Sequence, residues 1–171
     1  MRQSLWHRMD LLARQLTPSM LTLALVIIGV VPVRLLDFST VVPLLPLMAV
    51  YHWAIFRPRL LPAYAVFLAG LLQDILSGAP LGVNALVFLV AYGVVLSQKK
   101  FFTGKSFLIL WLGFALVAAL AATLHWLAVS LLNATLVEIR TAVWQYLLTV
   151  GFFPAVAWIF TRWQRAFLRL D

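Results

Sequence analysis

Six long apolar runs, separated by short segments rich in charged residues, proline or glycine, dominate the pattern of this chain. The runs cover residues 18–36, 40–56, 60–76, 81–96, 106–132 and 139–160. A helix needs ~20 apolar residues to cross the hydrocarbon core, whereas barrel strands need alternating segments of about ten. We therefore predict an all-α integral membrane protein, with six transmembrane helices in a compact bundle that forms a single domain over residues 1–171.

The segment before the first run, residues 1–17, has a different pattern. Its apolar residues recur at helical spacing, and polar residues lie between them. The apolar positions are Leu5, Met9, Leu12 and Leu16. This pattern predicts a short interfacial helix that lies along the membrane surface, with a frayed tail as the alternative. Farther along, Pro43, Pro46 and Pro154 predict kinked or loosened helices in the second and sixth spans.

Basic residues alternate between the connecting segments, and this alternation predicts the orientation. Eleven of the thirteen fall in segments on the side of the N-terminus, and only Arg34 and Arg140 fall on the other side. The eleven are Arg2, Arg8, Arg14, Arg57, Arg59, Lys99, Lys100, Lys105, Arg162, Arg165 and Arg169. Cytoplasmic loops of membrane proteins carry an excess of Lys and Arg. We therefore expect a multi-pass membrane protein with both termini in the cytoplasm.

Composition narrows the class of protein further. Apolar residues make up 64% of the chain and charged residues only 11%, compared with about a quarter in soluble domains. The net charge of +8 is spread over short segments without a basic stripe, so we expect membrane lipid, not nucleic acid, as its counterpart. The absence of cysteine excludes disulfides and thiolate metal sites.

Asp74 is the most informative polar residue, because it is an acid inside an apolar run and such groups are costly in a membrane. Gly70, Asp74 and Ser77 share one helical face near the outer end of the third span. We consider three roles for Asp74. It could accept hydrogen bonds from backbone N–H groups between Gly78 and Gly82 or at the start of the fourth span; it could pair with Arg34 or Arg140; or it could belong to a proton or ion relay.

A face of small residues in the fifth span predicts close helix packing. Its members are Ala118, Ala121, Ala122, His125 and Ala128. Small side chains let helices approach closely, and a histidine among them can form a hydrogen bond across the contact. We therefore interpret His125 as a packed residue, and we expect His52, beside Trp53 near the inner interface, to be hydrated.

Sequence signatures of catalysis are missing from the chain. There is no G-x-S-x-G or H-E-x-x-H motif, no glycine-rich loop placed to hold phosphate, and no spacing of histidines and acids that suits a metal. We therefore expect a protein that is not an enzyme and needs no cofactor.

The segment from Phe67 to Gly82 resembles the core motif of the MreD family of rod shape-determining proteins. That pattern is G-L-x-x-D-x-x-x-G-x-x-x-G, and the matching positions here are Gly70, Leu71, Asp74, Gly78 and Gly82. The chain length and the predicted six spans are also similar to those of the family. Independently of this resemblance, two glycines flanking Pro80 predict a tight turn between the third and fourth spans, shaped as a docking surface or as the rim of a cavity.

The resemblance implies a bacterial inner-membrane protein that is a non-catalytic subunit of the machinery for cell wall elongation and lateral peptidoglycan synthesis. Its implied partners are MreC, which is a single-span protein with a periplasmic domain, MreB, and the wall synthases of the complex. A small-solute-binding subunit similar to the S components of energy-coupling factor transporters is the alternative. Those components carry an Ala-x-x-x-Ala pair in their first span, whereas this first span has only Ala24.

Overall fold

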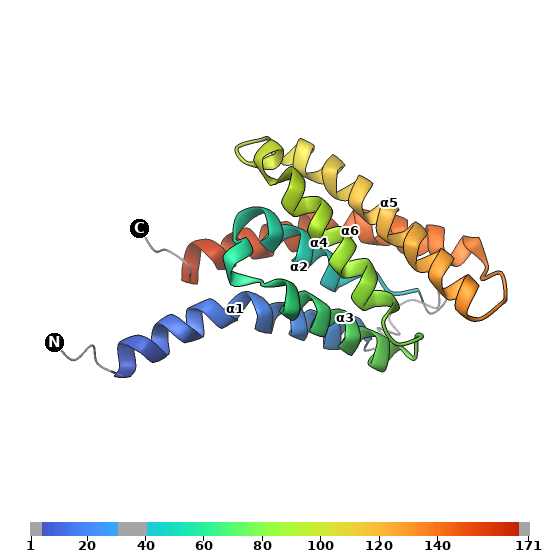
Figure 1. Ribbon diagram of the computed structural model, residues 1–171. Helices are drawn as coiled ribbons and strands as arrows, with labels where there is room; N and C mark the ends of the chain where they lie inside the picture. Colours follow the sequence, from blue (N-terminus) through green and yellow to red (C-terminus); the bar gives the residue numbers. More distant parts are fainter. Residues whose placement is uncertain (1–4, 31–40, 168–171) are drawn as a thin grey trace.

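The computed structural model describes residues 5–30 and 41–167, which fold into six α-helices and one 3₁₀ helix, with no strand among them. The helices are α1 (Leu5–Val30), α2 (Leu45–Phe56), η1 (Pro58–Leu60), α3 (Ala63–Ser77), α4 (Val83–Phe102), α5 (Phe107–Leu132) and α6 (Ile139–Phe167). They run up and down the bundle (Figure 1). The predicted all-α class is confirmed.

The two ends of the bundle differ in charge. The start of α1, the end of α6, η1 and the turn at 103–106 lie at one end, and the turns at 78–82 and 133–138 lie at the other (Figure 1). The described basic residues at the first end are Arg8, Arg14, Arg57, Arg59, Lys99, Lys100, Lys105, Arg162 and Arg165. At the opposite end only Arg140, in the first turn of α6, belongs to the described part of the chain. The fold therefore gathers the basic residues at one end, which we call the basic end.

Helix lengths divide the bundle into two groups. Three helices are long and apolar enough to cross a membrane, namely α4, α5 and residues Ile139–Ala166 of α6. The apolar part of α1 (Leu16–Val30), α2 and α3 are shorter. The protein is thus a helical membrane protein with three helices of full spanning length and three shorter apolar helices packed among them.

The short helix α2 forms the centre of the core. Ten of its twelve residues are buried, including Tyr51, His52 and Trp53. A helix that is apolar on all sides is typically buried on all sides, and α2 indeed contacts α1, α4, α5 and α6. This central position explains why the sequence of α2 lacks a polar face.

The chain before α2 is not helical, as the prolines predict. Pro43 precedes the helix, and Pro46 occupies its first turn, where a missing N–H is tolerated. Residues of α6 hold this segment, because the Leu44 N–H donates to Thr149 Oγ1 at 3.0 Å and Gln145 Nε2 donates to the Val42 carbonyl at 3.0 Å. Non-helical backbone at membrane depth needs such partners within the protein. In the predicted second span, residues 41–44 are therefore not helical, and the helix covers only Leu45–Phe56.

The proline in α6 has a different consequence. The helix continues from Ile139 to Phe167 through Pro154. Proline has no N–H to donate to the carbonyl four residues earlier, which here is Val150. The indole of Trp111 in α5 donates to that carbonyl at 3.0 Å. A neighbouring helix thus satisfies the group that the proline leaves free, and α6 is not broken.

The helix bounds differ from the predicted spans at several ends. α1 is continuous through Pro18, so the predicted interfacial segment and the first apolar run form one helix. α3 begins at Ala63 instead of residue 60, because η1 precedes it. α4 extends beyond residue 96 to Phe102 and carries Lys99 and Lys100 in its last turn, where cations complement the helix dipole. The predicted span residues 31–36 and 40 lie outside the described residues.

Candidate functional site

The hairpin of α3 and α4 carries the residues that the motif singles out. α3 ends at Ser77, and Gly78 follows with φ of +70°, in the left-handed region that glycine adopts without strain. The N–H groups of Gly78 and Ala79 both point back to the Asp74 carbonyl, the latter at 3.1 Å. This arrangement is a typical C-terminal cap. It turns the chain sharply away from the α3 axis and towards the start of α4.

The side chain of Asp74 then caps the next helix. Its Oδ2 accepts from the Gly82 N–H at 2.9 Å and more weakly from the Ala85 N–H at 3.5 Å. Its Oδ1 accepts from the backbone N–H and the side-chain amide of Asn84, both at 2.9 Å. The first N–H groups of a helix have no intrahelical partner and carry positive dipole charge. A carboxylate from α3 therefore serves as the N-terminal cap of α4.

Gly70 explains how the two helices come close enough for this contact. A Cβ atom built on Gly70 would lie 2.4 Å from the Ala85 Cα and 2.6 Å from the Ala85 nitrogen. Backbone atoms, unlike the end of a flexible side chain, cannot move aside for it. The absence of a side chain at Gly70 thus lets the α3 and α4 backbones touch one turn before Asp74, on the same face of α3.

The remaining motif residues form the surface of the turn. Ser77 and Gly78 are exposed, and Pro80 is half-buried. Gly82 has φ of +97°, which again requires the left-handed region. Leu81, between Pro80 and Gly82, has 70% of its surface exposed. The turn therefore exposes the apolar side chain of Leu81, and hydrogen bonds to Asp74 hold the backbone that follows it.

Two buried amides lie beside Asp74, and the sequence interpretation missed one of them, Asn84. Gln73 and Asn84 are 9% and 3% exposed, and Asp74 is 0% exposed. Neither Gln73 Oε1 nor Asn84 Oδ1 has a hydrogen-bond partner among the described residues. The sequence feature that could have indicated Asn84 is its position, since it is a single amide in an apolar run, two residues after Gly82.

The other roles considered for Asp74 find less support in these contacts. Arg140 is exposed, and no contact between it and Asp74 is found among the described residues, whereas Arg34 lies outside them. Within residues 5–30 and 41–167, no three histidine, aspartate or glutamate side chains gather where they could hold a metal ion. The hydrogen bonds that the Asp74 side chain accepts from described residues all come from donors at the start of α4, which is an arrangement for capping.

The predicted small-residue face of α5 is divided between two environments. Ala118 and Ala121 are buried in the hydrophobic core. Ala122 lines an open groove of about 300 Å³ between α5 and α6, together with Trp126 and Tyr146. His125 and Ala128 are half-buried. Only part of the face therefore serves packing within this chain, and the rest borders the groove.

The expectation that His52 is hydrated is wrong. The residue is 3% exposed, and its ring packs against those of Trp53, Phe56 and Phe160 with centroid distances of 5.3, 4.7 and 5.2 Å. Proximity to a charged turn suggested water, but α2 is enclosed by its neighbours up to its last turn.

The fold and the hairpin define a helical membrane protein in which a buried carboxylate joins two helices and fixes the turn between them. Residues 9–170 match the family described as rod shape-determining protein MreD. The chain belongs to the MreD family, as the resemblance of residues 67–82 predicts. No curated protein and no solved structure matches the chain.

Proposed function

We propose that this protein is a non-catalytic subunit of the cell-elongation complex in the bacterial inner membrane, where it holds MreC, MreB and lateral peptidoglycan synthases together. Membership of a shape-determining family supports the general role. The observation that supports a docking role is the turn at 78–82, which is fixed by the Asp74 cap and presents Leu81. A preorganised surface loses less conformational entropy on binding than a mobile loop does.

The proposal includes an orientation in which the basic end faces the cytoplasm. Most described basic residues lie at the end that contains η1 and the turn at 103–106, and cytoplasmic loops of membrane proteins carry an excess of Lys and Arg, which supports this orientation. The turn at 78–82 then faces the periplasm, where it is accessible to the periplasmic domain of a single-span partner such as MreC. MreB, as a cytoplasmic filament protein, would approach the basic end.

Cysteine labelling tests this orientation, and the chain has no cysteine of its own. Cysteines introduced at Ala79 and Thr135 should react in intact cells with a thiol reagent that does not cross membranes, because both belong to turns at the outer end. A cysteine at Thr103 should react only after the cells are opened. The opposite pattern would reverse the proposed orientation. Ser39, a third outer position by sequence, lies outside the described residues.

Substitution of Leu81 tests the docking role. Leu81→Glu places a charge at the exposed apex of the turn, where it removes an apolar contact without touching the core. We expect the variant to fold, to insert into the membrane at the normal level, and to lose at least about tenfold of its affinity for MreC, since ~1.4 kcal/mol corresponds to a factor of ten. The measurement is co-purification of MreC from cells, together with cell width.

Leu136 provides the matched control, because it is 87% exposed in the other outer turn. Leu136→Glu should leave co-purification and rod shape unchanged. Equal loss for Leu81→Glu and Leu136→Glu, or no loss for either, would show that the turn at 78–82 is not the docking surface. The alternative of a solute-binding subunit predicts instead a small polar molecule that co-purifies with the protein. The two hollows of the bundle are walled largely by apolar and aromatic side chains, which gives that alternative little support.

A further inference from the structure

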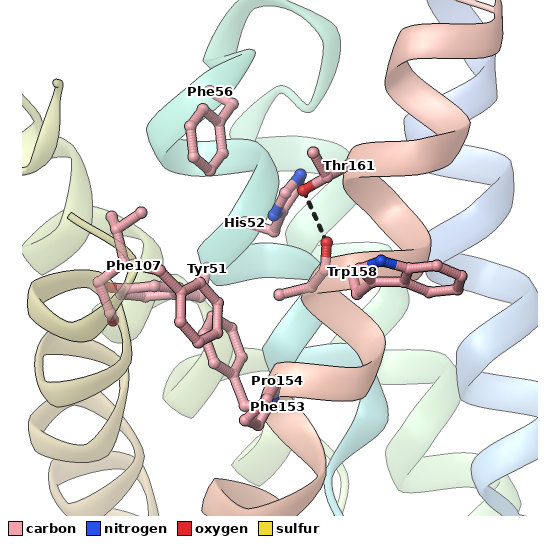
Figure 2. A pocket seen from close by; sticks show the side chains of 10 residues that line it. Tyr51, His52, Phe56, Phe107, Phe153, Pro154, Trp158 and Thr161 are labelled. Carbon is pink, nitrogen blue, oxygen red and sulfur yellow. Dashed lines mark hydrogen bonds between the residues drawn. The ribbon is translucent and has the colours of Figure 1, made fainter. Parts of the chain in front are cut away.

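A crevice of about 380 Å³ lies between α2, α5 and α6, far from the α3–α4 turn. Its walls include Tyr51, Phe107, Leu110, Phe153, Ala157 and Trp158. Figure 2 shows the side chains of the three helices around this space, with the indole of Trp158 turned towards the outer side of α6. Its two hydroxyl groups are already engaged, since Tyr51 donates to the Leu110 carbonyl at 2.8 Å and Thr161 donates to the Ala157 carbonyl at 2.8 Å. The other polar side chain of its wall is His52, which is only 3% exposed and whose Nε2 has no hydrogen-bond partner among the described residues, and the remaining lining side chains are apolar or aromatic. The crevice therefore suits a hydrocarbon chain, not a polar solute.

The crevice lies near the basic end and is open to the surroundings of the bundle. Phe56 and Phe107, the last residue of α2 and the first of α5, are 45% and 49% exposed at its edge. Trp158 is 64% exposed on the α6 side. Apolar side chains that are exposed at this depth meet lipid. A lipid chain can thus enter from the bilayer without crossing a polar barrier.

Positive charge accompanies the apolar walls. The Arg162 side chain lies over the Trp158 ring, 5.5 Å from its centroid, one turn farther along α6 towards the basic end. Lys105 precedes the wall residue Phe107 by two positions, and its Nζ lies 5.7 Å from the centroid of the Phe101 ring. Basic residues beside an apolar space between helices attract anionic lipid head groups. The charge pattern therefore complements a lipid that has one negative head group and one chain in the crevice.

We propose that this crevice is a binding site for an anionic phospholipid, with one acyl chain between α2, α5 and α6 and with the head group against Lys105 and Arg162. The bound lipid would lie beside Pro154 of α6 and would contact both α5 and α6. This inference does not depend on the proposed scaffold function, since it concerns neither the α3–α4 turn nor any protein partner.

Lipid binding to the full-length protein, purified in mild detergent, tests the proposal. Native mass spectrometry would follow titration with phosphatidylglycerol or with phosphatidylcholine of the same chains. We expect one phosphatidylglycerol per chain, bound about tenfold or more tightly than phosphatidylcholine. Lys105→Gln with Arg162→Gln should remove most of this preference. Equal binding of the two lipids to the unaltered protein would overturn the proposal.

Two pairs of variants distinguish binding of the lipid head group from binding of the acyl chain. Lys99→Gln with Lys100→Gln removes the same charge at the same end and should leave the lipid preference intact. Ala157→Leu narrows the crevice and should weaken both lipids, whereas Ala155→Leu on the exposed side of α6 should weaken neither. If Ala157→Leu does not fold, the comparison of the two charge pairs decides the question.

Three results would contradict the site. Equal losses for the two charge pairs would mean only general attraction to the basic end. Unchanged phosphatidylglycerol binding in a folded Ala157→Leu protein would place the acyl chain elsewhere. Loss of a protein partner in that variant, with lipid binding unchanged, would assign the crevice to a partner helix instead.

Discussion

Gly70→Ala should strongly destabilise the protein, although it adds a single methyl group. The new Cβ would lie 2.4 Å from the Ala85 Cα, so the α3 and α4 backbones would have to separate. Overpacking costs typically ~1–3 kcal/mol, and the cost here should reach the upper part of that range because no side chain can rearrange. Separation would also lengthen the hydrogen bonds from α4 to Asp74. Unfolding of purified protein in detergent, followed by circular dichroism, measures the effect.

Gly93→Ala is the matched control. Gly93 is also a helical glycine of this hairpin, in α4, but no atom lies within 4 Å of its Cβ position. Alanine is a better helix former than glycine by up to ~1 kcal/mol, so this variant should be neutral or slightly more stable. Similar losses of stability in the two variants would show that close contact with Ala85 is not what Gly70 provides.

The apolar pattern predicted the helical class, and each of its six runs contains an α-helix in the described residues, but it could not give the length of each helix. Hydropathy reports where a chain is apolar, whereas hydrogen bonds decide where a helix begins. The run at 40–56 is apolar throughout, yet α2 starts only at Leu45, because Pro43 interrupts the helix and α6 supplies partners for Val42 and Leu44. Those partners lie about a hundred residues away in sequence, beyond the reach of local pattern.

The same limit applies to the site. Asp74 stood out because an acid is costly in an apolar run, and its spacing from Gly70 placed both on one face. Asn84 did not stand out, because its role depends on the α3–α4 contact, which brings it to Asp74 at 2.9 Å. His52 was misplaced for a related reason, since burial of its neighbour Trp53 and of the whole of α2 follows from the packing of four helices around it.

Replacement of Asp74 should show whether its carboxylate acts as a cap. Asp74→Ala removes the acceptor for two backbone N–H groups at 2.9 Å, those of Gly82 and Asn84, and a buried donor without a partner costs ~1–3 kcal/mol. We therefore expect a loss of roughly 2–6 kcal/mol in the free energy of unfolding. Faster hydrogen exchange at residues 82–85 should accompany it, because the first turn of α4 would lose its cap.

Asp74→Asn should be intermediate, for a geometric reason. Each carboxylate oxygen of Asp74 faces N–H groups, Oδ2 that of Gly82 and Oδ1 those of Asn84. The single oxygen of an asparagine can therefore accept from only one of these two groups of donors, and its NH₂ group then faces the donors of the other. A loss of about half that of Asp74→Ala is expected, roughly 1–3 kcal/mol. Glu138→Ala, at an exposed acid near the same outer end, should change stability by no more than ~0.5 kcal/mol.

A cap and an ion relay make opposite predictions for these variants. If Asp74 is a cap, rod shape and partner co-purification at matched protein levels should follow folding stability, with Asp74→Asn better than Asp74→Ala in every measurement. If Asp74 is a relay, both variants should be equally inactive, since neither side chain can ionise. Their stability should then be unchanged or higher, because burial of a charge is costly. Equal inactivity in two stable, folded proteins would therefore reject the cap, whereas graded losses that match the free energy of unfolding would reject the relay.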